Sequence, residues 1–183
     1  MTLRALMTHD VKEIEIRLLT VDNVEAYSKI RLEALDRDSE AFSSSVEEHN
    51  KLSFDEIRRR LTANAPNNFV VGVFEGERLL GTAGFYRETG PKVQHKGHVW
   101  GVYLTAELRG KGIGRKMMRA VIDRAAELDG LEQIMISVAA TQTAAIGVYK
   151  ALGFVSFGTE PNALKVNGQQ IDKIYMMLPL DRA

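Results

Sequence analysis

Hydrophobic and polar residues alternate along residues 13–20, EIEIRLLT, as expected for a strand with one buried face. Helical spacing follows in 22–38, where apolar residues recur every three or four positions behind Asp22, the expected N-cap. A second helix is predicted over 53–64, because Ser53 and the glutamate three positions later form the signature of a capping box. The chain therefore opens with a strand and two helices.

The middle of the chain combines strand patterns with one long helical pattern. Residues 68–74 and 78–86 flank a polar EGE turn and predict a hairpin, and 97–104 is rich in β-branched and aromatic residues. An apolar stripe with helical spacing begins at Ile113 and runs to a terminating Gly130. Three strands are therefore expected before a central amphipathic helix.

The last third predicts further alternation of strand and helix. A strand is expected at 132–138, a helix at 143–152 and a strand at 154–158. The closing segment, 163–178, carries Asn167-Gly168 at its centre, a strong signal for a type I′ hairpin turn.

This order of elements predicts the fold class. No repeat or low-complexity linker divides the chain, so a single domain is expected over 13–183, with 1–12 as a short N-terminal tail. Interleaved strands and helices predict an α+β (α/β) domain around one mixed, mostly antiparallel sheet flanked by helices.

Composition removes several classes of function. Twenty-four Lys and Arg balance twenty-four Asp and Glu, so no overall field favours nucleic acid or an anionic membrane. There are no cysteines, which excludes disulfides and a thiol nucleophile and is consistent with a cytoplasmic location. No apolar run approaches the roughly 18 residues that a membrane helix needs. We therefore expect neither a nucleic-acid nor a membrane partner.

The stretch 107–116, ELRGKGIGRK, gathers three glycines and four cations between a predicted strand and a predicted helix. A nucleotide-hydrolysing loop needs Ser or Thr after Gly-Lys, and none follows here. A dinucleotide loop, counted from Gly110 and Gly112, needs a third glycine where Arg115 stands. The remaining pattern is Arg109-x-x-Gly-x-Gly at a helix N-terminus, whose free N–H groups can receive a phosphate.

This pattern resembles the acyl-CoA loop of the GNAT superfamily of N-acyltransferases. A second block, 136–154, is similar to the next strand and helix of that family, with an amide residue seven positions before Tyr149 and a helix that ends in Leu-Gly-Phe. The two blocks stand in the family's order and separation. The resemblance implies a sheet that is splayed where acetyl-CoA binds. No metal is expected, because His95 and His98 are three apart and would point to opposite faces of a strand, and no carboxylate cluster accompanies them.

The resemblance also implies residue roles in holding acetyl-CoA. Backbone groups of the strand near residue 102 would pair with the pantetheine arm like an extra strand, and a bulge at Gly101 would open the sheet. Amides of the glycine loop would hold the pyrophosphate, and Gln142 stands where the family has Asn. The expected cofactor-binding residues are Val102, Tyr103, Leu104, Arg109, Gly110, Lys111, Gly112, Ile113, Gly114, Arg115, Gln142 and Tyr149.

Catalytic roles follow from the same resemblance. Tyr149 would protonate the leaving thiolate, with a plain buried aromatic as the alternative, and the amide of Leu104 would stabilise the oxyanion. His98 stands eleven residues before Arg109, where several members of the family carry a glutamate that serves as the general base. An imidazole titrates near neutral pH and could take this role. In an unbroken strand His98 would share one face with Trp100, Val102 and Leu104.

The acceptor is less defined by sequence. Glu33, Glu40 and Tyr86 are candidates for acceptor binding, and the two glutamates are alternatives to His98 as the base. The expected function is transfer of an acetyl group from acetyl-CoA to a primary amine, with a non-catalytic acyl-CoA sensor as the alternative. Members of the family are often dimers, and the resemblance leaves a homodimer open here.

Overall fold

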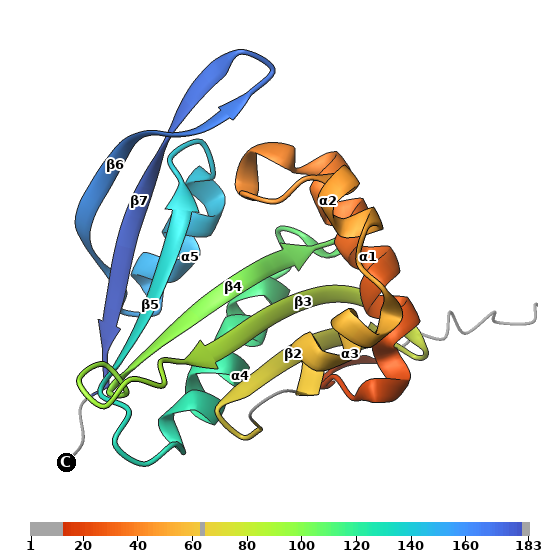
Figure 1. Ribbon diagram of the computed structural model, residues 1–183, viewed down its shortest axis with the longest axis horizontal. Helices are drawn as coiled ribbons and strands as arrows, with labels where there is room; N and C mark the ends of the chain where they lie inside the picture. The colour runs from red at the N-terminus through yellow and green to blue at the C-terminus, as the bar shows by residue number, and fades with distance from the viewer. Residues whose placement is uncertain (1–12, 63–64, 181–183) are drawn as a thin grey trace, which may run out of the picture.

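One mixed sheet of seven strands organises residues 13–62 and 65–180, which the computed structural model describes (Figure 1). Its order is β1-β2-β3-β4-β5-β7-β6, and every pair is antiparallel except β4 and β5. The strands are Ile14–Leu18 (β1), Asn68–Glu75 (β2), Arg78–Arg87 (β3), Lys96–Leu104 (β4), Gln133–Ala139 (β5), Val155–Val166 (β6) and Gln169–Pro179 (β7). The predicted α+β class and mostly antiparallel sheet are confirmed, and the predicted tail at 1–12 lies outside the described residues.

Five α-helices and three 3-10 turns connect these strands within the described residues. The helices are Val24–Arg37 (α1), Val46–Asn50 (α2), Phe54–Thr62 (α3), Ile113–Ala126 (α4) and Thr143–Ala151 (α5). The 3-10 turns are Val21–Asn23 (η1), Ser39–Ala41 (η2) and Ala106–Leu108 (η3). The short helix α2 lies between the two helices expected from the sequence, and a capping box at Ser45 starts it.

Helix starts agree with the sequence signals except at α1. Ser53 and Glu56 form the predicted reciprocal cap of α3, since Glu56 N–H donates to Ser53 Oγ and Ser53 N–H to Glu56 Oε2. The prediction of Asp22 as an N-cap is wrong: Thr20 caps η1, in a capping box with Asn23. The chain therefore enters α1 through an extra turn, because Thr20 is the first residue whose side chain reaches the free N–H groups.

The C-terminal strands form a longer ribbon than predicted. The expected strand at 154–158 and the first arm of the expected hairpin belong to one strand, β6, which is interrupted by register irregularities against β7. Asn167 and Gly168 stand at the hairpin tip with φ of 49° and 80°, as a type I′ turn requires. The ribbon projects beyond the rest of the sheet in Figure 1.

Helices cover both faces of the sheet and bury a core on each. The alternation of β2 sends Val71 and Val73 toward the α4 face, and Val70 and Phe74 toward the α1/α3 face. The apolar stripe of α4 supplies the larger core, and α5 joins the same face through Tyr149. The sheet is therefore a buried partition with a separate helical layer on each side.

No helix within 13–62 and 65–180 is long and apolar enough to cross a membrane.

Candidate active site

The sheet opens between its two parallel strands. β4 and β5 are in register only over Lys96–Val99 and Gln133–Ile136, and beyond that they diverge, as Figure 1 shows. A cavity of about 450 Å³ occupies the opening. Met117 and Tyr149 line it from the α4/α5 face, and Phe42 lines it from the segment after α1. The cavity lining therefore combines residues from both faces of the sheet.

A bulge at Gly101 creates this geometry. Gly101 has a φ of 61°, and the register of β4 against β3 shifts between Thr82 and Gly84. Trp100 packs in the core under α1 and α3, whereas Val102 and Leu104 pack against the α4 core. The bulge that the sequence predicted is therefore confirmed. Glycine suits this position because any other side chain would be strained in this backbone conformation.

The same bulge overturns the expected alignment of His98 with Val102 and Leu104, whereas the expected alignment with Trp100 holds. The strand is not unbroken, because one extra residue at Gly101 reverses the alternation. His98 and Trp100 flank Val99, which packs in the α4 core, so they share the α1/α3 face. Val102 and Leu104 point to the opposite face.

Backbone groups of β4 point into the opening as expected. Thr105 N–H donates to Leu80 O on β3 at 2.9 Å. Since alternate residues of a strand direct their backbone groups to opposite sides, Leu104 and Val102 direct their N–H and C=O groups away from β3. Both residues line the cavity beyond the point where β5 leaves. The backbone of Val102 and the N–H of Leu104 are therefore available to a ligand in the place of a missing strand, while Leu104 O accepts a hydrogen bond from Arg109.

The glycine loop forms one end of the cavity. Gly110 and Gly112 have φ values of 74° and 75°, and Gly112 is the N-cap of α4 without a side-chain cap. Gly114 is already helical and lines the cavity, and a Cβ there would meet only the Leu104 side chain, at 4.0 Å. Folding does not require glycine at position 114, so the space it leaves suits a ligand held against free helical N–H groups.

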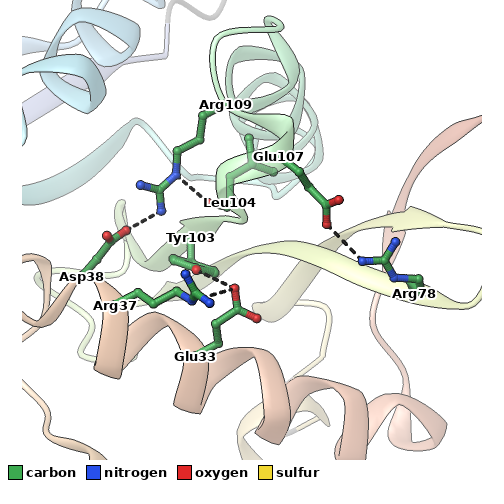
Figure 2. Close-up of polar contacts among 8 residues, drawn as sticks. All are labelled: Glu33, Arg37, Asp38, Arg78, Tyr103, Leu104, Glu107 and Arg109. Carbon is green, nitrogen blue, oxygen red and sulfur yellow. Dashed lines mark hydrogen bonds and ion pairs between the residues drawn. The ribbon is translucent and has the colours of Figure 1, made fainter.

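Arg109 is held by the protein at the edge of this loop. Figure 2 shows its Nε donating to Leu104 O, at 2.8 Å, and its Nη2 pairing with Asp38 Oδ2, at 2.5 Å. Its guanidinium also lies 5.5 Å from the centre of the Tyr103 ring. The side chain thus connects the loop to the end of α1.

Tyr103 forms a second link to α1. Its hydroxyl donates to Glu33 Oε1 at 3.0 Å, and Arg37 lies 3.6 Å from the same oxygen (Figure 2). Burial, the hydrogen bond to Glu33 and the nearby carboxylates of Glu33 and Asp38 raise the pKa of Tyr103 to about 12, and Arg109 opposes them. Tyr103 therefore keeps its proton at neutral pH and acts as a hydrogen-bond donor.

Tyr149 lies at the wall of the cavity on α5. Its side chain is 4% exposed and packs against Phe154, with ring centres 5.9 Å apart. Burial raises the pKa of its hydroxyl well above the ordinary value, so this group is protonated at neutral pH. A protonated hydroxyl beside the cavity can give a proton to a bound molecule.

Most of the predicted cofactor residues meet at this cavity. Its lining includes Val102, Tyr103, Leu104, Arg109, Gly110, Gly112, Gly114, Arg115, Gln142 and Tyr149. Lys111 is exposed beside the loop, and the side chain of Ile113 is buried in the core, which leaves only its amide for a ligand.

The predicted base and acceptor residues lie outside this lining. His98 stacks on Tyr86 at 4.9 Å between ring centres and is hydrogen-bonded to Glu88 at 3.0 Å. Glu33 lines a separate surface hollow on the far side of Tyr103, and Glu40 lies in η2. None of these residues lines the cavity, although Glu33 accepts a hydrogen bond from Tyr103, which does.

The segment after α1 contributes residues that sequence reasoning missed. Asp38, Ala41 and Phe42 line the cavity, and the Arg31 guanidinium lies 4.4 Å from the centre of the Phe42 ring. A signal for Arg31 was present, because this cation interrupts the apolar stripe that Tyr27, Ile30, Ala34 and Leu35 form on α1. Nothing comparable marked Asp38, whose partner is far along the chain.

No group of three or more His, Cys, Asp and Glu side chains suited to a metal ion occurs in the part of the chain that the structure describes.

Comparison with known families agrees with this geometry. The profile of the acetyltransferase (GNAT) family matches residues 31–154, which include the bulged strand, the glycine loop and Tyr149. The chain belongs to the GNAT acetyltransferase family. The GNAT assignment rests on a match over more than half of the chain and agrees with the predicted resemblance.

Individual GNAT relatives match more narrowly in sequence than in fold. An L-methionine sulfoximine/L-methionine sulfone acetyltransferase from Pseudomonas paraeruginosa is 34% identical over 80 residues, which are 44% of this chain and 46% of the relative. This chain thus matches about half the length of that curated relative.

Two solved GNAT-like structures cover nearly the whole chain. An acetyltransferase of the GNAT family from Streptococcus pneumoniae superposes with a TM-score of 0.81 at 18% identity, over 92% of this chain and all of the other. The yncA protein of Salmonella typhimurium, solved with its cofactor acetyl-CoA, superposes with a TM-score of 0.78 at 21% identity, over 93% of this chain and 95% of the other. At these identities the similarity shows the shared fold.

Proposed function

We propose that this chain is an N-acetyltransferase that moves an acetyl group from acetyl-CoA directly to a primary amine. One observation carries the proposal: a cavity lined from both faces of the sheet lies at the Gly101 bulge, between an uncapped glycine loop and the buried Tyr149. The Pseudomonas relative is named for acetyl transfer to an amino acid derivative, which supports the same reaction class.

The residues that line the cavity fit acetyl-CoA. Free N–H groups at Gly112 and the first turn of α4, with Arg115 beside them, suit the pyrophosphate. The backbone of Val102 and Leu104 suits the amides of the pantetheine arm, which would replace the strand that β5 no longer supplies. The side chain of Gln142 makes no hydrogen bond within the described residues, so its side-chain amide is also free for this arm.

In the proposed reaction the amine nitrogen forms a bond to the thioester carbonyl carbon, and the carbon–sulfur bond breaks. The Leu104 N–H would stabilise the negative charge that develops on the carbonyl oxygen. The thiolate would take the proton of the Tyr149 hydroxyl, which burial keeps protonated. The amine proton would leave toward the α1/α3 face.

His98 remains our proposed proton acceptor, acting through water because it lies outside the cavity lining. It occupies the same face of the sheet as Trp100, which does line the cavity. The Glu88 carboxylate, 3.0 Å from His98 Nε2, would stabilise the imidazolium that forms. Glu33 is less suited, because it already accepts the hydrogen bond of Tyr103 and pairs with Arg37.

The acceptor class covers small amines, amino acids, antibiotics and protein or peptide amines, and we further propose cytoplasmic location. The test combines thermal stabilisation by CoA and acetyl-CoA with thiol release across a panel of these amines. We expect stabilisation by both ligands and release that depends on one class of amine. Stabilisation without turnover would favour an acyl-CoA sensor, and absence of stabilisation would contradict the proposal.

A further inference from the structure

Arg31 has an unusual environment for a cation. It lies within the apolar stripe of α1, and its Nη1 is buried without a hydrogen-bond partner among the described residues. No carboxylate of 13–62 or 65–180 pairs with it. Burying a cationic N–H group without a hydrogen-bond partner is unfavourable, so the position of Nη1 needs a physical reason.

The groups around Arg31 are neutral or positive. Its pKa is lowered, first by burial and then by the charge of Arg60, while Tyr27 acts in the opposite direction. The buried His49 also has a lowered pKa, because of its burial and the positive charges of Arg31 and Arg60. The ring of Phe42 offers a cation–π contact, which is weaker than a charge partner. The surroundings therefore favour an anion next to Arg31.

Arg31 is placed at the α1 side of the cavity. A Cβ at Gly101 would stand 3.9 Å from Nη1, and both Gly101 and Phe42 line the cavity. Arg31 itself does not line the cavity and its Nη1 is buried, but glycine at position 101 puts no side chain between Nη1 and the cavity at this point. The glycine loop and Tyr149 lie toward the other face, where the acyl donor is proposed to bind.

We propose that Arg31 binds a carboxylate of the acceptor, so that the acceptor is a free α-amino acid rather than a simple amine. This inference rests on the proposed function. A carboxylate matches the planar fork of a guanidinium, and its single negative charge would neutralise the single buried cation. Phe42 and Trp100 would provide apolar walls for the rest of the acceptor, so an uncharged side chain is expected.

The first test compares L-leucine with L-leucinamide and L-methionine sulfone with its carboxamide, with acetyl-CoA as the donor. Each amide keeps the amine and the side chain but lacks the carboxylate. We expect the acids to be preferred by about 100-fold in kcat/KM, since a polar site rejects an analogue that leaves its buried group unpaired. Equal rates on acid and amide would overturn the inference and leave the proposed function intact.

The second test uses Arg31→Met and Arg31→Lys. Arg31→Met should lower kcat/KM for the acids to the level of the amides, mainly through KM, and leave the amides unchanged. Arg31→Lys should recover part of the loss, because it keeps the charge without the fork. Lys29→Met removes an exposed cation from the same helix and should not change kcat/KM for the acids or for the amides. A loss of equal size on acids and amides would contradict a role in carboxylate binding.

A binding measurement separates this role from a structural one. N-acetyl-L-leucine, added with CoA, should raise the melting temperature of the wild-type chain and fail to raise that of Arg31→Met. The variant itself should melt no lower than wild type, because the buried unpaired charge is gone. If Arg31→Met does not fold, Arg31 is structural and its role in carboxylate binding is refuted. The preference of the wild-type chain for acids over amides would then decide whether the acceptor is a free acid. Absence of turnover on every amine would overturn the proposed function and this inference together.

Discussion

Arg109 and Asp38 form an ion pair at 2.5 Å that joins the glycine loop to the end of α1 (Figure 2). The two residues are 71 positions apart, and both line the cavity. Arg109 also donates to Leu104 O, so one side chain holds the loop against both α1 and β4. The donor side of the cavity and the segment that borders its acceptor side are thus mechanically connected.

Asp38→Asn should weaken this connection without unfolding the protein. The two side chains are 24% and 46% exposed, so the pair contributes at most about 1 kcal/mol to stability. We expect kcat/KM for acetyl-CoA to fall about 5-fold, which corresponds to about 1 kcal/mol. Steady-state kinetics and a thermal melt measure the two effects.

A matched control is the ion pair between Arg78 and Glu107, whose distance is 3.1 Å (Figure 2). Glu107→Gln breaks a comparable exposed pair that does not line the cavity and should leave the kinetics unchanged. Identical kinetics in Asp38→Asn and Glu107→Gln would show that the link from Asp38 to Arg109 does not position the loop.

Gly114→Ala should separate stability from ligand binding. Alanine at a helical position is favoured over glycine by up to about 1 kcal/mol, and the new Cβ meets no close atom of the protein. The same Cβ would project into the cavity at the proposed pyrophosphate site. We expect a higher melting temperature and a dissociation constant for CoA that is at least about 10-fold higher, because a lost contact of about 1.4 kcal/mol gives that factor.

Gly147→Ala provides the control for Gly114→Ala. Gly147 also lies in a helix, α5, has open space around a Cβ and does not line the cavity. It should stabilise the protein and leave CoA affinity unchanged. If Gly114→Ala bound CoA as tightly as Gly147→Ala does, the ligand would not approach α4 at this point.

Tyr149→Phe should slow the reaction without weakening the donor complex. The loss of a general acid lowers kcat by about 100-fold or more, while the ring still packs against Phe154. Burial raises the pKa of this hydroxyl, so wild-type activity should not fall with tyrosine ionisation as the pH rises toward 10. Kinetics from pH 6 to 10 and CoA thermal shifts test both points, and an unchanged kcat would remove the acid role.

Tyr103→Phe should alter the alkaline stability of the fold. The pKa of Tyr103 is raised from 10.0 to about 12 in the folded state, so the unfolded chain loses this proton first as the pH rises. The free energy of unfolding therefore falls between about pH 10 and pH 12 in the wild type. Chemical denaturation in this range should give a shallower decline for Tyr103→Phe, and parallel curves would contradict the assignment.

Local signals in the sequence predicted most of the fold. The Ser53 capping box, the Asn167-Gly168 turn and the stripe from Ile113 each depend on residues within a few positions, and the structure agrees with all three. The error at Asp22 has a local cause: Thr20 caps the 3-10 turn Val21–Asn23 and accepts from Asp22 N–H, so Asp22 lies inside a turn and not at the start of one.

The site was predictable only in part, because some of it depends on long-range geometry. The glycine loop and Tyr149 carry patterns within short segments, and both line the cavity. The bulge at Gly101 was predicted from the sequence, but the predicted alignment of His98 with Val102 and Leu104 holds only for an unbroken strand. Asp38 comes to the cavity through the packing of α1 near β4, which no local pattern encodes, and Arg31 lies beside the Phe42 ring that lines the cavity.

The most direct test of the central claim is transfer of label from acetyl-CoA, carrying an isotope in its acetyl carbon, to an amine. The purified wild-type chain would be incubated with L-leucine, L-methionine sulfone and their amides, and both thiol release and labelled product would be measured. The account predicts one labelled N-acetyl product for each thiol released, with Tyr149→Phe about 100-fold slower. Acyl-CoA binding without label on any amine would contradict it.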